Sequence, residues 1–216
     1  MQSQSAAGLH WKLIAILAAL LATVAFSLIF GPVISNWLEM RKYATGLSPC
    51  YGYPDDIDTL IQRHLPARAD LSITVFPAFS SPKAIRLIGN DLYYLSMDFP
   101  IYVRGKERLK LNTNGIPQVR VIRLANSTAK QVVEVVANDI VHADAEFPKG
   151  SDGVTYYFRT SDQKCGMAWP TDDNTRAWYA ARIFDALADR AKARTSTEIS
   201  AADQAILRNV KKLRAH

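Results

Sequence analysis

The sequence predicts an α+β domain with a mainly antiparallel sheet, preceded by a single N-terminal transmembrane helix. Three observations carry this prediction: residues 13–38 carry no formal charge, a two-residue alternation starts at Asp70, and helical spacing returns after residue 172. The chain has 216 residues, a length that is enough for one ordinary domain with appendages. It carries 26 Lys and Arg against 20 Asp and Glu.

Residues 1–12 are expected to form a short tail and residues 13–38 a membrane anchor. The apolar part, residues 13–34, has 22 residues. At about 1.5 Å of rise each they span roughly 33 Å, enough for a hydrocarbon core of about 30 Å. Trp11 and Trp37 stand near the two ends, where indole rings anchor at headgroups. We therefore expect a single-pass signal-anchor that contacts the lipid bilayer through residues 13–34.

Two other interpretations of this segment stay open. Lys12 and the small residues of Thr23-Val24-Ala25 fit a cleaved secretory signal, although cleavage there would leave an apolar new N-terminus. A buried core helix would need protein on every side, because the segment has no polar stripe. The flanking cations, Lys12 against Arg41 and Lys42, nearly balance and do not decide the orientation.

The two cysteines give the remaining argument for localisation. Cys50 and Cys165 both follow the apolar segment, and a lone pair of this kind is typical of one disulfide in an oxidising compartment. The alternative is two buried thiols in a cytosolic domain. We predict a Cys50–Cys165 disulfide and an inner-membrane protein whose C-terminal domain is extracytoplasmic, in the periplasm.

A connector, residues 39–54, leads into the α+β domain, residues 55–216. Proline at the first helical position and acidic residues in the first turn predict a short helix from Pro54-Asp55-Asp56 that ends at Pro66. Its apolar face consists of Ile57, Leu60, Ile61 and Leu65.

Strands are expected from Asp70 onward. Leu71, Ile73 and Val75 alternate with polar residues, which indicates one buried and one solvated face. The connections are too short for crossover helices, so the sheet should be mainly antiparallel. Further strands are predicted at Lys83–Ile88, Leu92–Met97, Ile101–Arg104, Arg108–Leu111, Val119–Leu124, Gln131–Val136, Ile140–Ala145 and Val154–Arg159.

Two helices are expected after the sheet. Asp172-Asp173-Asn174 supplies N-cap chemistry for the first, and Ser200 with Asp203 resembles a capping box for the second. Helically spaced apolar residues mark both buried faces: Ala180, Ile183, Phe184, Leu187, Ala188 and Ala191 in the first, and Ala202, Ile206, Val210 and Leu213 in the second.

Two features are candidates for partner binding. Residues 176–216 hold nine Lys and Arg against four acidic residues, and Arg208, Lys211, Lys212 and Arg214 lie away from the apolar stripe. Such a face suits an acidic partner or anionic lipid, and the alternative is a solvated face that favours the negative end of the helix dipole. Tyr157 is expected to be partly exposed if Tyr156 is buried, and an exposed Tyr on a sheet is a common binding anchor.

No catalytic residue is assigned. His142 and Asp144 share one side of a predicted strand and could act as a general base with its orienting carboxylate, and Lys164 could favour a Cys165 thiolate. However, no nucleophile is placed beside the His, and a disulfide would remove the thiolate. No metal site is predicted, because the ligands are too few, and no cofactor or nucleic-acid motif occurs.

These observations predict a membrane-anchored, non-enzymatic binding module of the cell envelope whose partner is another envelope protein. It would be an accessory subunit of an envelope or secretion complex, or a toxin-neutralising, immunity-type protein. The alternative is a membrane-anchored extracytoplasmic hydrolase that uses Cys165 or the His142/Asp144 pair.

Overall fold

A computed structural model describes most of the chain after residue 45. The described residues are 46–50, 55–77, 81–97, 102–104, 109–111, 116–143, 153–169 and 173–216, with twelve further residues between 16 and 34. The chain divides into two compact units, Met1–Arg41 and Lys42–His216, and the β-sheet with its covering helices belongs to the second.

The predicted transmembrane helix at residues 13–38 has to be corrected. Within the described residues, no helix is long and apolar enough to cross a membrane. Of the 22 residues 13–34 for which lipid contact was expected, ten lie outside the described part.

The predicted α+β architecture with an antiparallel sheet is confirmed. Seven strands follow the order β1-β9-β8-β2-β3-β4-β7, and every neighbouring pair is antiparallel. A separate hairpin joins β5 (Tyr102–Arg104) to β6 (Leu109–Leu111). The seven strands are β1 (Ser48–Pro49), β2 (Leu71–Pro77), β3 (Lys83–Ile88), β4 (Asp91–Ser96), β7 (Gln118–Arg123), β8 (Val154–Thr160) and β9 (Cys165–Ala168).

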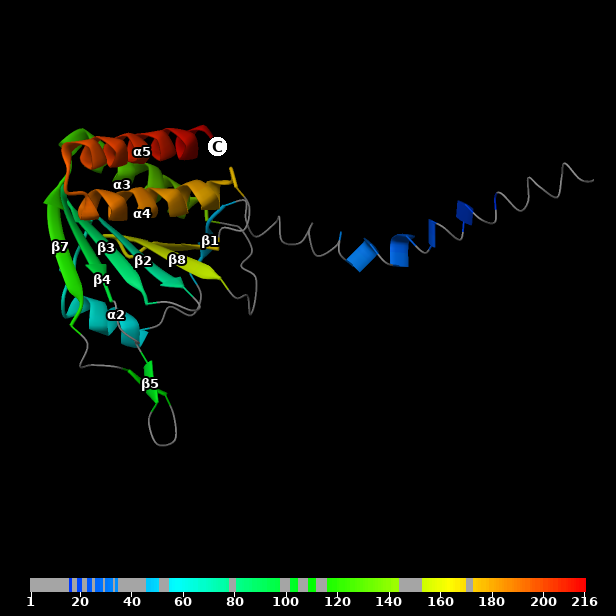
Figure 1. Cartoon of the computed structure of the whole chain (residues 1–216), viewed down its shortest axis with the longest axis horizontal. Helices are drawn as coiled ribbons and strands as arrows, with labels where there is room; N and C mark the ends of the chain where they lie inside the picture. Colours follow the sequence, from blue (N-terminus) through cyan, green and yellow to red (C-terminus); the bar gives the residue numbers. More distant parts are fainter. Residues whose placement is uncertain are drawn as a thin grey trace, which may run out of the picture. The chain divides into compact units, whose positions relative to one another are not determined.

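Helices cover both faces of this sheet (Figure 1). On one face lie α3 (Asn126–Val141), α4 (Arg176–Lys192) and α5 (Ser196–Ala215), which pack on the main hydrophobic core. On the other lies α2 (Asp55–Gln62), which packs on Ala84, Leu95 and Met97. The prediction that one face of the sheet is solvated was therefore wrong. The reason is that α2 covers this face, where polar residues such as Ser72 and Thr74 are buried.

The helix α3 is the largest difference from the predicted elements. Strands were expected at Gln131–Val136 and Ile140–Ala145, but both lie wholly or partly in this helix. The helix therefore interrupts the strands instead of following them, so three helices cover the main core rather than two. Its buried apolar positions, Ala129, Val132, Val135, Val136 and Ile140, recur at helical spacing.

The predicted apolar faces of α4 and α5 are confirmed, since every residue named for them is buried. Their caps differ from the prediction. The α4 N-cap is Thr175, whose hydroxyl accepts from the Trp178 backbone N–H at 3.2 Å. The capping box of α5 consists of Thr195 and Glu198, several residues before the one expected. An N-cap has extended backbone, and Asn174, with φ of 65°, does not.

A buried cluster of charged residues fixes α2 on the sheet. Asp58 of α2 accepts a hydrogen bond from Arg86 of β3 at 3.2 Å and lies 3.6 Å from the Arg159 guanidinium of β8. The oxygen that faces Arg159, Oδ2, also accepts from the Gln62 amide at 2.7 Å. Arg86 and Arg159 both stand in register with Ser72, so the two cations flank β2 on the face under α2.

Candidate functional site

The predicted disulfide between Cys50 and Cys165 is present. The register that pairs Ser48 with Met167 and Pro49 with Gly166 sets Cys50 opposite Cys165 at the end of the β1–β9 pair. Their Cα atoms lie 5.5 Å apart, which suits both a cross-strand pair and a disulfide. The bridge thus attaches the chain that enters the domain to an edge of the sheet.

The structure describes two of the three residues considered for hydrolysis, Cys165 and His142. Cys165 belongs to β9 and is bonded to Cys50, so it has no thiolate to offer. His142 is the exposed C-cap of α3, not a strand residue, and its Nδ1 lies 2.8 Å from the Asn138 carbonyl oxygen. The proposed partner, Asp144, lies outside the described residues. Cap geometry therefore accounts for the described part of this pair.

Tyr157 is buried rather than partly exposed, which corrects the expectation made for it. Only 9% of its surface is accessible, and its ring packs edge-on against Phe76 with centroids 5.4 Å apart. Burial also raises the pKa of its phenol. The reason is again the second covered face: Tyr156 enters the main core while Tyr157 faces the side that α2 covers.

The four cations proposed on the last helix are exposed on α5, as expected. Arg214 reaches Glu134 of α3 at 3.8 Å and helps to line a cavity of about 360 Å³ at the C-terminal end of α5. Arg208, Lys211 and Lys212 have no carboxylate at ion-pair distance within the described part of the chain. This basic face is accessible to a partner, and its role in binding stays a prediction.

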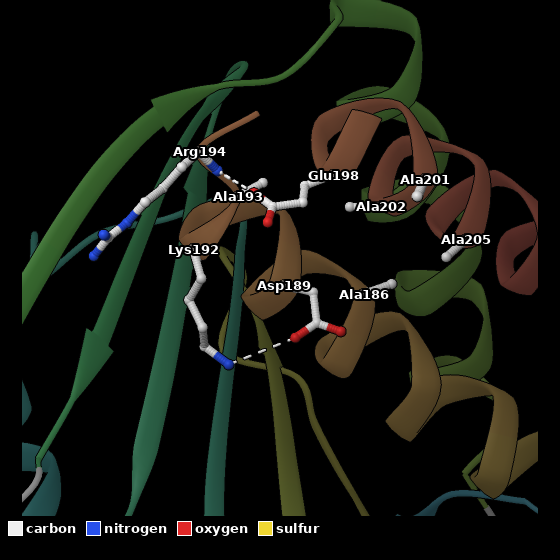
Figure 2. A pocket seen from close by; sticks show the side chains of 9 residues that line it. All are labelled: Ala186, Asp189, Lys192, Ala193, Arg194, Glu198, Ala201, Ala202 and Ala205. Carbon is white, nitrogen blue, oxygen red and sulfur yellow. Dashed lines mark hydrogen bonds and ion pairs between the residues drawn. The ribbon is translucent and has the colours of Figure 1, made fainter. Parts of the chain in front are cut away.

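A second hollow, the α4–α5 crevice, lies beside the turn between these two helices (Figure 2). It encloses about 480 Å³ and is open to solvent. Five alanines form its apolar wall and four charged residues its rim: Ala186, Ala193, Ala201, Ala202 and Ala205, with Asp189, Lys192, Arg194 and Glu198. The space exists because the side chains that face it on both helices are small, and none of them is large enough to fill the gap.

The rim carboxylates of the crevice are already engaged. Asp189 pairs with Lys192 at 3.5 Å. Glu198 accepts from the backbone N–H groups of Arg194, at 2.7 Å, and Thr195, at 3.0 Å, and these bonds lower the pKa of its carboxyl group. A carboxylate held in this way is a poor general base, since a base needs a pKa near the working pH. Glu198 is therefore poorly suited to act as a general base.

Sequence reasoning did not find this crevice. Its alanines were identified only as core positions, and the space depends on the angle and distance between two helices. Within the described residues, no three His, Cys, Asp or Glu side chains come together as a metal site would require.

Comparison of the chain with protein-family models, curated proteins and solved structures gives no match.

Proposed function

We propose that this chain is a non-enzymatic binding domain that works in an oxidising compartment and recognises another protein. The observation that carries the proposal is the α4–α5 crevice, which offers an apolar wall to solvent while its rim carboxylates are held within the domain. An apolar side chain of a partner would fill it, as anchor residues do at protein interfaces. The disulfide supports the choice of compartment, since such bonds persist where thiols are not kept reduced.

A matched pair of tryptophan variants tests this proposal. Ala201 lines the crevice, and its neighbour Ser200 is also exposed but does not line it. In affinity capture from the source cells, the full chain carrying Ala201→Trp should retain at least about ten-fold less partner than the wild type, a loss of about 1.4 kcal/mol in binding free energy. Ser200→Trp should retain the wild-type amount.

Circular dichroism of both variants controls for folding. Equal retention by the two variants would exclude the crevice as the contact surface. Turnover of a substrate by the wild-type chain would refute the non-enzymatic assignment.

A further inference from the structure

The strand β7 lies at an open edge of the seven-stranded sheet (Figure 1). It pairs with β4 on one side, and within the described residues no strand pairs with its other side. Natural edge strands are protected by covering, by Pro or by charge, because their free backbone groups can pair with another chain. Here one face of the edge strand exposes two valines, Val119 at 41% and Val121 at 56%, and the charge on that face, Arg123, is paired with Asp91 of β4 at 3.0 Å.

The register identifies the backbone groups that face outward. Leu124 N–H donates to the Asn90 carbonyl at 2.9 Å, and this pair continues the β4–β7 register. Hydrogen-bonded pairs alternate along an antiparallel ladder, so Ile122 and Arg120 also direct their N–H and C=O groups to β4. Val119, Val121 and Arg123 consequently present theirs to the open edge.

The two faces of this edge differ in chemistry. Val119 and Val121 lie on the α2 side, since their partners Leu95 and Tyr93 belong to the core under α2. On the other side lies Arg120, whose guanidinium donates to the Lys192 carbonyl at the end of α4 at 3.3 Å.

Cationic groups gather on the side of Arg120. Arg194 follows Lys192 by two residues, and Figure 2 shows its side chain pointing away from the crevice. Among the described residues, no carboxylate pairs with the guanidinium of Arg120 or Arg194. The edge therefore combines an apolar face with a cationic one.

From this arrangement we infer that β7 accepts an extended segment of another protein as an eighth, antiparallel strand. The segment alternates apolar side chains, which lie beside Val119 and Val121, with acidic side chains, which lie beside Arg120 and Arg194. Main-chain hydrogen bonds supply affinity in this mode of recognition, and the alternating side chains supply specificity. This inference rests on the proposed binding function and adds the chemistry of the partner.

A second copy of this chain is a worse fit to the same edge. Antiparallel pairing of two β7 strands, centred on Val121, would place the two Arg120 side chains diagonally opposite each other on one face. Like charges on neighbouring strands repel, so this pairing would be destabilised. The whole chain also carries a net charge of +6, which opposes self-association.

Fluorescence anisotropy with the full chain tests the inference. The probe is a labelled nine-residue peptide in which Val and Glu alternate, and its control has Lys in place of Glu. Two further peptides carry N-methyl groups, either on the Val residues, whose N–H groups would face β7, or on the Glu residues, whose N–H groups would face away. We expect the Glu peptide and its N-methyl-Glu form to bind, and the other two to lose at least about ten-fold in affinity.

Two variants of the chain complete the test. Val121→Pro removes an outward N–H that β4 does not use, so the edge strand tolerates it, whereas Val121→Thr keeps that donor. Val121→Pro should weaken binding of the Glu peptide at least about ten-fold relative to Val121→Thr. Arg120→Gln should weaken it about two- to five-fold and reduce the effect of salt, as expected for an exposed ion pair.

Equal binding of the Glu and Lys peptides, or of the two Val121 variants, would overturn the inference. A chain that dimerises by itself, with Val121→Pro abolishing the dimer, would make a second copy the occupant. If the peptide fails to bind while Ala201→Trp still reduces partner capture, strand addition is wrong and the proposed binding function stands.

Discussion

Replacement of Asp58 by Ala should be among the most destabilising single changes in this domain. Arg86 is 3% exposed, and its Nε–H already has no hydrogen-bond partner in the described structure. Loss of the carboxylate at 3.2 Å would leave this guanidinium buried without a counter-ion. Removing one partner of a buried ion pair costs about 3–5 kcal/mol. Because whole domains are stable by about 5–15 kcal/mol, a large part of the free energy of unfolding would be lost.

A matched control separates burial from the ion pair itself. Asp91 and Arg123 are 3.0 Å apart, closer than Asp58 and Arg86, but their side chains are 37% and 74% exposed. Asp91→Ala should therefore cost less than about 1 kcal/mol. The double variant Asp58→Leu with Arg86→Met removes both charges of the buried pair, leaves the more exposed Arg159 in place, and should regain most of the lost stability.

Urea unfolding of the full chain, followed by near-ultraviolet circular dichroism, measures these differences by linear extrapolation. The reasoning fails if Asp58→Ala costs no more than Asp91→Ala, because the buried cluster would then add nothing beyond a surface ion pair. It also fails if the double variant is less stable than Asp58→Ala alone.

Two further predictions concern the disulfide and a buried phenol. Denatured, unreduced protein should show no reactive thiol, and two reactive thiols would contradict the bond. Replacing Cys50 and Cys165 by Ser should lower the free energy of unfolding in urea by at most about 5 kcal/mol, because the bond closes a long loop between residues separated by 115 positions. Burial, with the nearby Asp185 carboxylate adding to it, raises the pKa of Tyr156 to about 12. An unfolded Tyr has a pKa near 10, so the free energy of unfolding should fall as the pH rises from about 10 through 12. The Tyr156→Phe variant should show a weaker dependence of this free energy on pH. Phenolate absorbance from Tyr156 near pH 10 in folded protein would contradict the prediction.

The predicted fold was most accurate where local and tertiary signals agree. In α4 and α5, strong helix-forming residues such as Ala and Leu coincide with an apolar stripe, and the buried faces were identified residue by residue. In α3 the two signals conflict. Val132, Val135, Val136 and Ile140 have helical spacing, but β-branched residues favour strands, and the intrinsic preference was given too much weight.

The second covered face could not be predicted from the strands alone. Ser72 and Thr74 alternate with apolar residues as solvent-facing positions do, yet both are buried under α2. A polar side chain in a strand indicates a solvent-exposed face only when no other element of the protein supplies its hydrogen bonds. The burial of Tyr157 has the same cause.

The candidate surfaces were accessible to sequence reasoning only in part. A lone cysteine pair after an apolar segment was enough to predict the bond between Cys50 and Cys165. The α4–α5 crevice and the open edge of β7 depend on which elements are neighbours in space. No local pattern around Ala201 or Val121 contains that information.

The position of the disulfide also has a mechanical consequence. A pulling force applied between the N-terminal part of the chain and the end of α5 would enter at Cys50, cross the sulfur–sulfur bond and leave through Cys165. The strands β2 to β8 and the helices α2 and α3 lie inside the bridged loop and would carry no tension along the backbone. Beyond the bridge, the loaded path runs through β9, α4 and α5. The bridge therefore protects most of the sheet, including β7, from being extended when the ends of the chain are pulled apart.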